Sequence, residues 1–157
     1  MTTDTITRCD LAVVGGGIAG LYAALCVGDE ADVLLLSKGP LRSSASYLAQ
    51  GGVAAAVGVD DSPELHAQDT MRAGRGLCRE SAVRELVGEA PARVADLAEL
   101  GVPFDHEPGL EGGHSRRRVL HVAGAATGKE ILRVLGKRLA TAPIAPISVY
   151  PTPITRS

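Results

Sequence analysis

Six residues near the N-terminus have the types and spacing needed to hold a phosphate group. The stretch Gly15-Gly16-Gly17-Ile18-Ala19-Gly20 contains the pattern GxGxxG. In this pattern the first glycine permits a tight turn, the second lets a pyrophosphate approach the backbone, and the third lets a helix pack closely on a strand. N–H groups at the start of that helix then face the phosphates. The motif therefore predicts dinucleotide binding, and the alternative is a glycine-rich turn without a ligand.

The elements around the motif decide between these alternatives. Residues 10–14 form a short apolar run typical of a buried parallel strand, and residues 31–36 form a second one. Between them, residues 21–27 are rich in Ala and Leu and predict a helix. The order strand, glycine turn, helix, strand is a βαβ unit, which is the context that a dinucleotide-binding motif requires.

The position that usually binds the ribose is unusual here. An acidic residue is expected about 20 residues after the motif, where it accepts a hydrogen bond from the ribose 2′-hydroxyl. This chain has Ser37-Lys38 at that place. A ribose contact must therefore come from Ser37, Lys38 or the backbone, and Lys38 would also suit the 2′-phosphate of NADP.

A second candidate binding segment follows the βαβ unit. Its residues are Ser43, Ser44, Ala45, Ser46, Tyr47, Leu48, Ala49, Gln50, Gly51, Gly52 and Val53. Their hydroxyls, amide and glycines can hydrogen-bond a polar heterocycle and leave room for it, although a flexible linker would have the same composition. We expect residues 37–58 to be a long loop with little secondary structure, which in a compact domain is usually functional or disordered.

Helices are expected in the middle of the chain. Ser62 suits an N-cap and Pro63 a first helical position, so a helix should run to about Arg72. Apolar residues continue at helical spacing over 83–100, where Pro91 should divide or kink the helix and Gly101 should cap it.

The last third of the chain predicts a loop, a helix and a short strand. Residues 102–118 should be mostly loop. Thr127 can then cap a helix with one apolar face made of Ile131, Leu132, Leu135 and Leu139. Residues 147–150 could form a third strand. Four prolines crowd the last 15 residues, so we expect a separate proline-rich tail at 141–157.

Composition excludes several classes of protein. The 157 residues carry 16 Lys and Arg against 18 Asp and Glu, a balance that gives no electrostatic footprint for nucleic acid or an anionic membrane. No apolar run is long enough for a transmembrane helix, and the N-terminus lacks a signal sequence, so we expect a cytoplasmic protein. The three cysteines have no CxxC spacing and the histidines no metal-ligand spacing, so no disulfide framework or metal site is expected.

Five segments together resemble the fumarate reductase/succinate dehydrogenase flavoprotein family. They are residues 15–20, 37–40, 47–53, 111–121 (EGGHSRRRVLH) and 126–128 (ATG). The resemblance covers residues 8–140. It implies an α/β fold, an incomplete Rossmann-like FAD-binding domain with the start of a capping domain. A sheet of this class has about five strands, so we expect a truncated or frameshifted product or a piece of a longer chain.

The resemblance also implies a cofactor and its contacts. Within the GxGxxG motif it implies that Gly16, Gly17, Ile18 and Ala19 contact the pyrophosphate of FAD. It places Lys38 near the adenosine end and residues 45–52 around the flavin. Succinate dehydrogenases carry a histidine bonded to FAD where this chain has Ala45, so FAD is expected to be non-covalent.

Within the family, the motifs are most similar to members that oxidise L-aspartate to iminoaspartate in de novo NAD biosynthesis, with O₂ or fumarate as electron acceptor. Glu111 matches a glutamate that orients the substrate ammonium, although it could be an ordinary exposed loop residue. His114 and Arg116–Arg118 could attract a dicarboxylate, although three arginines more often form a solvated edge.

The family's catalytic arginine and its other dicarboxylate ligands lie downstream of these residues, so no catalytic residue is assigned here and the isolated chain is expected to be inactive. Three alternatives remain open: a non-catalytic nucleotide-binding module, a flavoprotein of the succinate dehydrogenase or fumarate reductase type, and an NAD(P)-binding Rossmann half. Residues 43–52 argue against the last, because an ordinary NAD domain does not need them.

Overall fold

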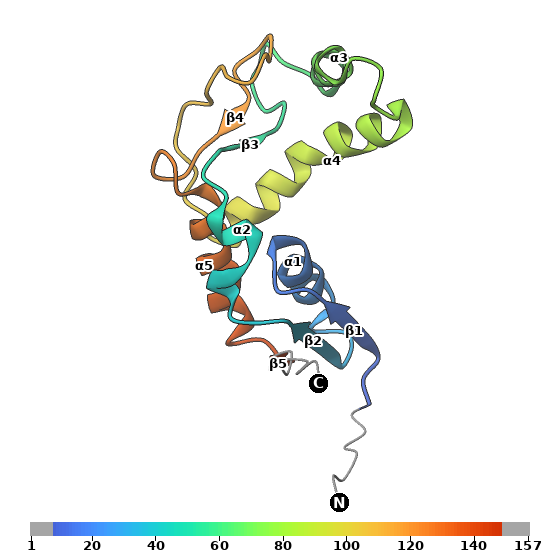
Figure 1. The fold of residues 1–157 in the computed structure, drawn as a ribbon. Helices are drawn as coiled ribbons and strands as arrows, with labels where there is room; N and C mark the ends of the chain where they lie inside the picture. The colour runs from blue at the N-terminus through green and yellow to red at the C-terminus, as the bar shows by residue number, and fades with distance from the viewer. Residues whose placement is uncertain (1–7, 149–157) are drawn as a thin grey trace, which may run out of the picture. The chain divides into compact units, whose positions relative to one another are not determined.

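The computed structural model describes residues 8–148, which form two compact units (Figure 1). The sheet unit comprises residues 8–48 and 131–148, and the helical unit comprises residues 49–130. Residues 149–157, most of the expected proline-rich tail, lie outside the described residues. Among the described residues, no helix is both long enough and apolar enough to cross a membrane.

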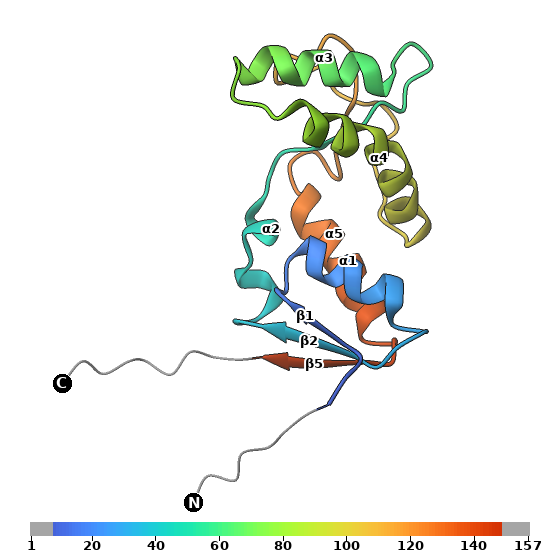
Figure 2. The same ribbon diagram turned by 90° about the vertical axis from the view of Figure 1, so that its right-hand side faces the viewer.

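The sheet unit contains the predicted βαβ unit. Strand β1 (Leu11–Val14) is followed by helix α1 (Ile18–Val27) and strand β2 (Val33–Ser37), and the two strands are parallel with Val13 opposite Leu35. Strand β5 (Ile144–Ser148) pairs in parallel with the other side of β2. The sheet order is therefore β1-β2-β5, with β2 in the centre (Figure 2).

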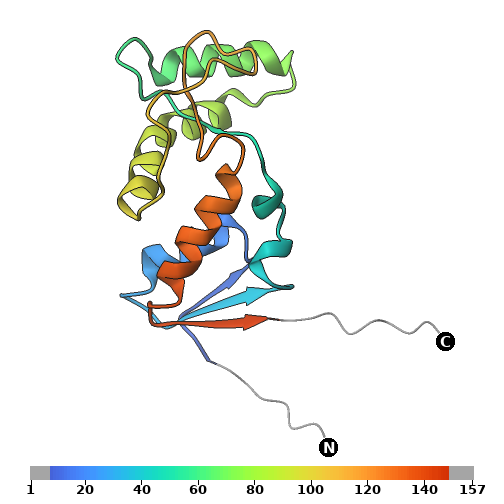
Figure 3. The ribbon, with the colours of Figure 1, turned by 90° about the vertical axis from the view of Figure 1, so that its left-hand side faces the viewer.

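Two helices cover one face of this sheet. Helix α1 and helix α5 (Thr127–Leu139) lie on the same side of the three strands in Figures 2 and 3. The predicted apolar face of α5 is confirmed, because the side chains of Ile131, Leu132, Leu135 and Leu139 are all buried. They join Leu21 and Ala24 of α1 and Val33, Leu34 and Leu35 of β2 in the buried set of the unit.

The outer strand β1 is more exposed than the central strand β2, and the other outer strand, β5, contains a proline. In β1, Leu11 is 36% exposed and Val14 is 82% exposed, whereas the first three residues of the central strand β2 are buried. In β5, Pro146 stands opposite Leu35 of β2. This strand begins at Ile144, three residues before the expected start, because the sequence signal was obscured by the prolines on both sides.

The predicted long loop at 37–58 contains more structure than expected. A 3₁₀ turn at Leu41–Ser43 is followed by the one-turn helix α2 (Ala45–Leu48) and the two-residue strand β3 (Val53–Ala54). Serine hydroxyls hold the turns: Ser44 Oγ donates to the carbonyl of Leu41 at 2.7 Å and accepts the N–H of Tyr47 at 3.2 Å. Elements this short have no periodicity that a sequence can display.

The helical unit is built from helices α3 (Pro63–Gly74) and α4 (Glu80–Glu99) and a short antiparallel pair. The predicted cap of α3 is confirmed, since Ser62 Oγ accepts the N–H of Leu65 at 3.2 Å. In the pair, Val53 of β3 stands opposite Leu120 of β4 (Val119–Leu120). Two apolar clusters stabilise the unit, one around Ala67, Val83 and Val87 and one around Ala55, Val94 and Leu120.

Two helix predictions need correction. The expected division at Pro91 is wrong, because α4 is continuous from 80 to 99, and Val87 before the proline and Val94 after it are both buried; the alternative, a kink at Pro91, stays a prediction. Thr127 is the first residue of α5, but its hydroxyl accepts the N–H of Val122 at 3.1 Å and so holds the preceding loop. Gly101 does follow the end of α4 with a φ of +105°, as a glycine after a helix should.

Candidate functional site

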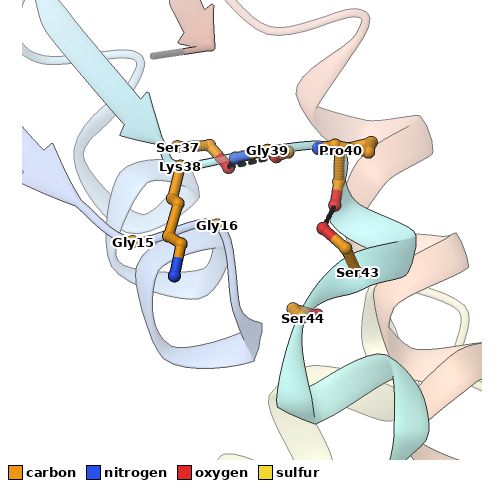
Figure 4. Close-up of a pocket in the computed structure, with 8 residues that line it drawn as sticks. All are labelled: Gly15, Gly16, Ser37, Lys38, Gly39, Pro40, Ser43 and Ser44. Carbon is orange, nitrogen blue, oxygen red and sulfur yellow. Dashed lines mark hydrogen bonds between the residues drawn. The ribbon is translucent and has the colours of Figure 1, made fainter. Parts of the chain in front are cut away.

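The strongest candidate site is a cavity of about 320 Å³ in the sheet unit. It lies where β1 and β2 end and α1 begins, which is the edge at which parallel α/β sheets bind ligands. Its lining residues are Gly15, Gly16, Ser37, Lys38, Gly39, Pro40, Ser43 and Ser44 (Figure 4). The structure thus brings together the glycine motif, the ribose position and the start of the second candidate segment, all predicted separately from the sequence.

The glycines of the motif are required by the backbone. Gly15 has a φ of +125°, a region that side chains rarely adopt. A Cβ at Gly20 would overlap the carbonyl oxygen of Gly15, so the helix packs on the turn only because position 20 has no side chain. A Cβ at Gly16 would lie 2.6 Å from Ser37 Oγ and would narrow the cavity. This close, side-chain-free turn fits the pyrophosphate of a dinucleotide.

The start of α1 lies against the second candidate segment. Gly17 is the N-cap of α1 and has no side chain to satisfy the helix N–H groups. Ser46 Oγ instead accepts the N–H of Ile18 at 3.3 Å, and a Cβ at Gly17 would lie 3.1 Å from that oxygen. Ile18 is half-buried and Ala19 exposed. The N-terminal end of α1, where the helix dipole favours negative charge, is therefore lined by small groups only.

The position expected to bind the ribose carries a cation, Lys38, and a hydroxyl, Ser37 Oγ, that already makes a hydrogen bond. Ser37 Oγ donates a hydrogen bond to the carbonyl of Gly39 and accepts the N–H of Gly39 at 3.4 Å, so its proton is already in use. Lys38 is exposed and lines the cavity, where Figure 4 shows its side chain extended beside the Gly15–Gly16 turn. Lys38 is thus the charged residue of this cavity.

The rest of the predicted flavin segment divides between the two units. Ala45, Ser46, Tyr47 and Leu48 belong to α2 in the sheet unit, and Ala49, Gln50, Gly51 and Gly52 begin the helical unit. The carbonyl of Ala49 accepts the N–H of Gly128 at 3.2 Å, which joins this segment to the ATG motif. A Cβ at Gly52 would lie 2.5 Å from the carbonyl oxygen of Leu120, so packing against β4 is sufficient to explain this glycine.

Glu111 lies in a tight turn of the helical unit. Gly112 and Gly113 follow it with φ values of +63° and +80°, and the N–H of His114 closes the turn on the carbonyl of Glu111 at 3.1 Å. The Glu111 side chain is 52% exposed, and its Oε1 accepts a hydrogen bond from His121 Nε2 at 2.8 Å. Sequence reasoning proposed a role for Glu111 but did not identify His121 as its partner.

Arg118 is buried, and its guanidinium is already paired with carboxylates. Its side chain is fully buried and makes two hydrogen bonds with Asp61, at 2.8 and 2.9 Å. A third, at 2.9 Å, reaches Asp69 Oδ2, which also accepts the N–H and the hydroxyl of Ser115. The expectation that all three arginines form a solvated edge or attract a dicarboxylate is therefore wrong for Arg118, whereas Arg116 and Arg117 are exposed.

The buried network changes the acidity of two of its members. Burial alone would raise the pKa of Asp69, but the hydrogen bonds from Ser115 and the charge and hydrogen bond of Arg118 together lower it. Burial lowers the pKa of His66, and the positive charge of Arg118 and the nearby His114 lower it further. The His66 and His114 rings meet edge to face at 5.2 Å. His66 is therefore held in its neutral form at neutral pH.

The described residues provide no evident metal centre. Between residues 8 and 148, no group of three or more His, Cys, Asp or Glu side chains is arranged to hold a metal ion.

Comparisons with known proteins point to one family. The model of a family described as "FAD binding domain" matches residues 10–152. The L-aspartate oxidase of Mesorhizobium japonicum is 50% identical over 130 residues, which are 78% of this chain and 25% of that protein. The L-aspartate oxidase of Streptomyces coelicolor is 49% identical over 133 residues, which are 80% of this chain and 23% of that protein.

A solved structure gives the same result for the fold. A quinol fumarate reductase from E. coli superposes with a TM-score of 0.80 and 31% identity, covering 89% of this chain and 26% of that one. The predicted fold class is thereby confirmed. The chain spans about a quarter of the length of the curated relatives it matches.

Proposed function

This chain belongs to the FAD-binding domain family, and from that premise we propose that it forms the N-terminal part of an enzyme that oxidises L-aspartate to iminoaspartate. The observation that carries the proposal is the cavity in which the GxGxxG turn, the start of α1 and Lys38 meet. Its side-chain-free turn fits a dinucleotide, and the similar proteins named L-aspartate oxidase supply the substrate.

The residues of the sheet unit would hold FAD mainly through backbone groups. The N–H groups at the start of α1, around Gly16 and Gly17, would hold the pyrophosphate, and the helix dipole would add to the attraction. Lys38 supplies the positive charge near the adenosine end. Ser46 holds the start of α1 and thereby keeps the turn in place. When bound, FAD supplies a hydride acceptor, which none of the side chains of this chain can provide.

The proposed attachment of FAD is non-covalent, because the position of the linking histidine is occupied by Ala45. An alanine methyl group cannot form a bond to the flavin. After acid denaturation of the FAD-loaded chain, all flavin absorbance should remain in the supernatant. Flavin that stays with the precipitated protein would refute this part of the proposal.

Glu111 is proposed to recognise the substrate ammonium. A carboxylate that faces an ammonium makes a charge-assisted hydrogen bond, and succinate lacks the group that would form it. Glu111 is half exposed and one of its oxygens, Oε2, is not used in the bond with His121. This is the feature that favours aspartate oxidation over the succinate or fumarate chemistry of the similar fumarate reductase.

Further parts of the proposal follow from the substrate. We place the reaction in NAD biosynthesis, in the cytoplasm, with O₂ or fumarate as the electron acceptor and without nucleic acid or membrane partners. The balance of 16 basic and 18 acidic residues supports the absence of the last two.

The first experiment is a titration of the purified chain with FAD, followed through the visible absorption spectrum. A perturbed flavin spectrum is expected, with binding weakened by Lys38→Ala and unchanged by Lys129→Ala. Lys129 is the matched control because it is also an exposed lysine and its replacement changes the charge equally. Equal affinities of the two variants would exclude Lys38 from the site. Absence of binding in the folded wild-type chain would contradict the proposal.

A further inference from the structure

The contact between His121 and Glu111 extends the proposed function. We propose that His121 is a positioning residue that holds one oxygen of Glu111 and thereby directs the other oxygen to the substrate ammonium. The inference rests on the proposed role of Glu111, but the geometry that suggests it lies entirely within the helical unit and is independent of the FAD cavity.

The direction of the hydrogen bond follows from the chemistry of the two groups. An ionised carboxylate only accepts hydrogen bonds, so His121 Nε2 carries the proton and donates it to Glu111 Oε1 over 2.8 Å. His121 is 18% exposed and Glu111 is 52% exposed. The less exposed imidazole therefore restrains the more exposed carboxylate through this hydrogen bond.

Two glycines make room for this pair. A Cβ at Gly109 would overlap Glu111 Oε1 and would lie 3.5 Å from His121 Nε2. A Cβ at Gly52 would lie 3.0 Å from His121 Cε1. The imidazole and the carboxylate thus occupy space that any other residue at position 109 would fill.

Gly109 cannot move away to accommodate a side chain. Its N–H donates to the carbonyl of Val119 at 2.7 Å, and its carbonyl accepts the N–H groups of Arg118 and Val119 at 3.1 and 3.2 Å. The backbone of His121 is fixed as well, because its carbonyl accepts the N–H of Asp105 at 2.8 Å. Both ends of the pair are therefore anchored to the backbone around β4.

The other nitrogen of the imidazole is consistent with this role. His121 Nδ1 is buried and has no hydrogen-bond partner among the described residues. The described hydrogen bonding of the ring is therefore directed to Glu111 alone.

The test measures the hydrogen bond and the substrate preference separately. The hydrogen bond is measured by NMR of the chain labelled with ¹⁵N-histidine. The Nε2 resonance of His121 is assigned by its disappearance in His121→Gln, and Glu111→Ala should shift it. The resonance should be unaffected by His106→Gln, a change of an exposed histidine. An Nε2 resonance that ignores Glu111→Ala would overturn the inference.

Substrate preference is measured by flavin-difference titration with L-aspartate and with succinate, in the FAD-loaded enzyme of which this chain is proposed to be the N-terminal part, because the family's other dicarboxylate ligands lie downstream of these residues. His121→Ala should weaken aspartate binding by about ten- to a hundredfold, the usual value of a hydrogen bond to a charged group, and leave succinate binding unchanged. His121→Gln retains a donor and should restore most of the aspartate affinity. Equal losses for both ligands, or no rescue by glutamine, would show that His121 only supports the fold.

A second variant displaces the same carboxylate without replacing the histidine. Gly109→Ala should displace Glu111 and reproduce the selective loss of aspartate affinity, whereas Gly88→Ala, which meets no atom within 4 Å, should not. The Nε2 resonance can respond to Glu111→Ala while the wild-type protein shows no preference for aspartate over succinate. In that case the proposed function fails, and so does the proposed recognition of the substrate ammonium by Glu111. The restraint of Glu111 by His121 would then stand alone.

Discussion

The two units of this chain position their candidate functional residues in opposite ways. In the sheet unit the site depends on missing side chains, since Gly15, Gly16 and Gly20 allow backbone groups to line the cavity. In the helical unit the segment that carries Glu111 depends on a long side chain seven residues further on, Arg118, which is buried and pairs with Asp61 and Asp69. The first arrangement is local in sequence and the second joins residues about fifty positions apart.

This difference predicts which substitutions each unit tolerates least. The largest effect is expected from Arg118→Met, which removes the cation from the buried carboxylate of Asp61 and leaves Asp69 with only the exposed Arg72, at 3.5 Å. Breaking a buried ion pair from one side typically costs about 3–5 kcal/mol. Hydrogen exchange of the amides in α3 and α4 should therefore accelerate strongly, whereas amides of β2 report on the other unit.

The control for this variant is Arg116→Met. Arg116 pairs with Asp60 at 3.7 Å, and both side chains are largely exposed. Exposed pairs of this kind contribute about 0–1 kcal/mol. Similar losses of protection for the two variants would contradict the view that the buried network stabilises the helical unit.

The next largest effect is expected in the sheet unit from Gly20→Ala. The added Cβ overlaps the carbonyl oxygen of Gly15, and overpacking of this kind typically costs about 1–3 kcal/mol. FAD binding should be lost with it, because the turn must open. Denaturant unfolding and the flavin titration measure the two consequences.

Gly88→Ala provides the matched comparison. Gly88 lies in α4, is exposed, and a Cβ there meets no atom within 4 Å. Because alanine favours helices, this substitution should stabilise the chain by about 0.5–1 kcal/mol. A stabilising Gly20→Ala would show that the close helix–strand contact is not needed.

The smallest expected effect is on the pH dependence of stability, and it concerns a residue of the helical unit, His66. The pKa of His66 is lowered in the folded chain, through burial and the charge of Arg118, so the unfolded chain binds the proton more readily. The stability that neutral His66 contributes is thus fully present above about pH 6.5, the model-peptide value, and is lost as the pH falls below it. His66→Phe should reduce this loss in denaturant unfolding curves, and His106→Gln should not.

The same contrast explains what the sequence could predict. The βαβ unit and the GxGxxG turn were predictable because glycine spacing and apolar runs are local signals, complete within about 30 residues. The pairing of Arg118 with Asp61 was not, because nothing within one element indicates a partner 57 positions away. The strands β3 and β4 were missed for a related reason, since two residues carry no alternation.

His121 lies between these cases. It ends the 111–121 motif that carries the family resemblance, but the sequence gives it no role of its own and no metal-ligand spacing, whereas the glycine at position 109 offers a hint. A glycine in an extended pairing often marks a close approach of another group. The partner was Glu111, ten residues earlier and across a turn whose two positive-φ glycines could not be assigned from the sequence.

The two edge strands of the three-stranded sheet differ, and the difference indicates at which edge a further strand can pair. Proline has no N–H to donate between strands and is found in sheets essentially at edge strands. Pro146 is therefore compatible with β5 as an edge strand that pairs only with β2. Strand β1 contains no proline and leaves Leu11 and Val14 exposed. Any additional strand, from this polypeptide or another, is thus expected beside β1, which would move β1 from the margin of the sheet toward its centre.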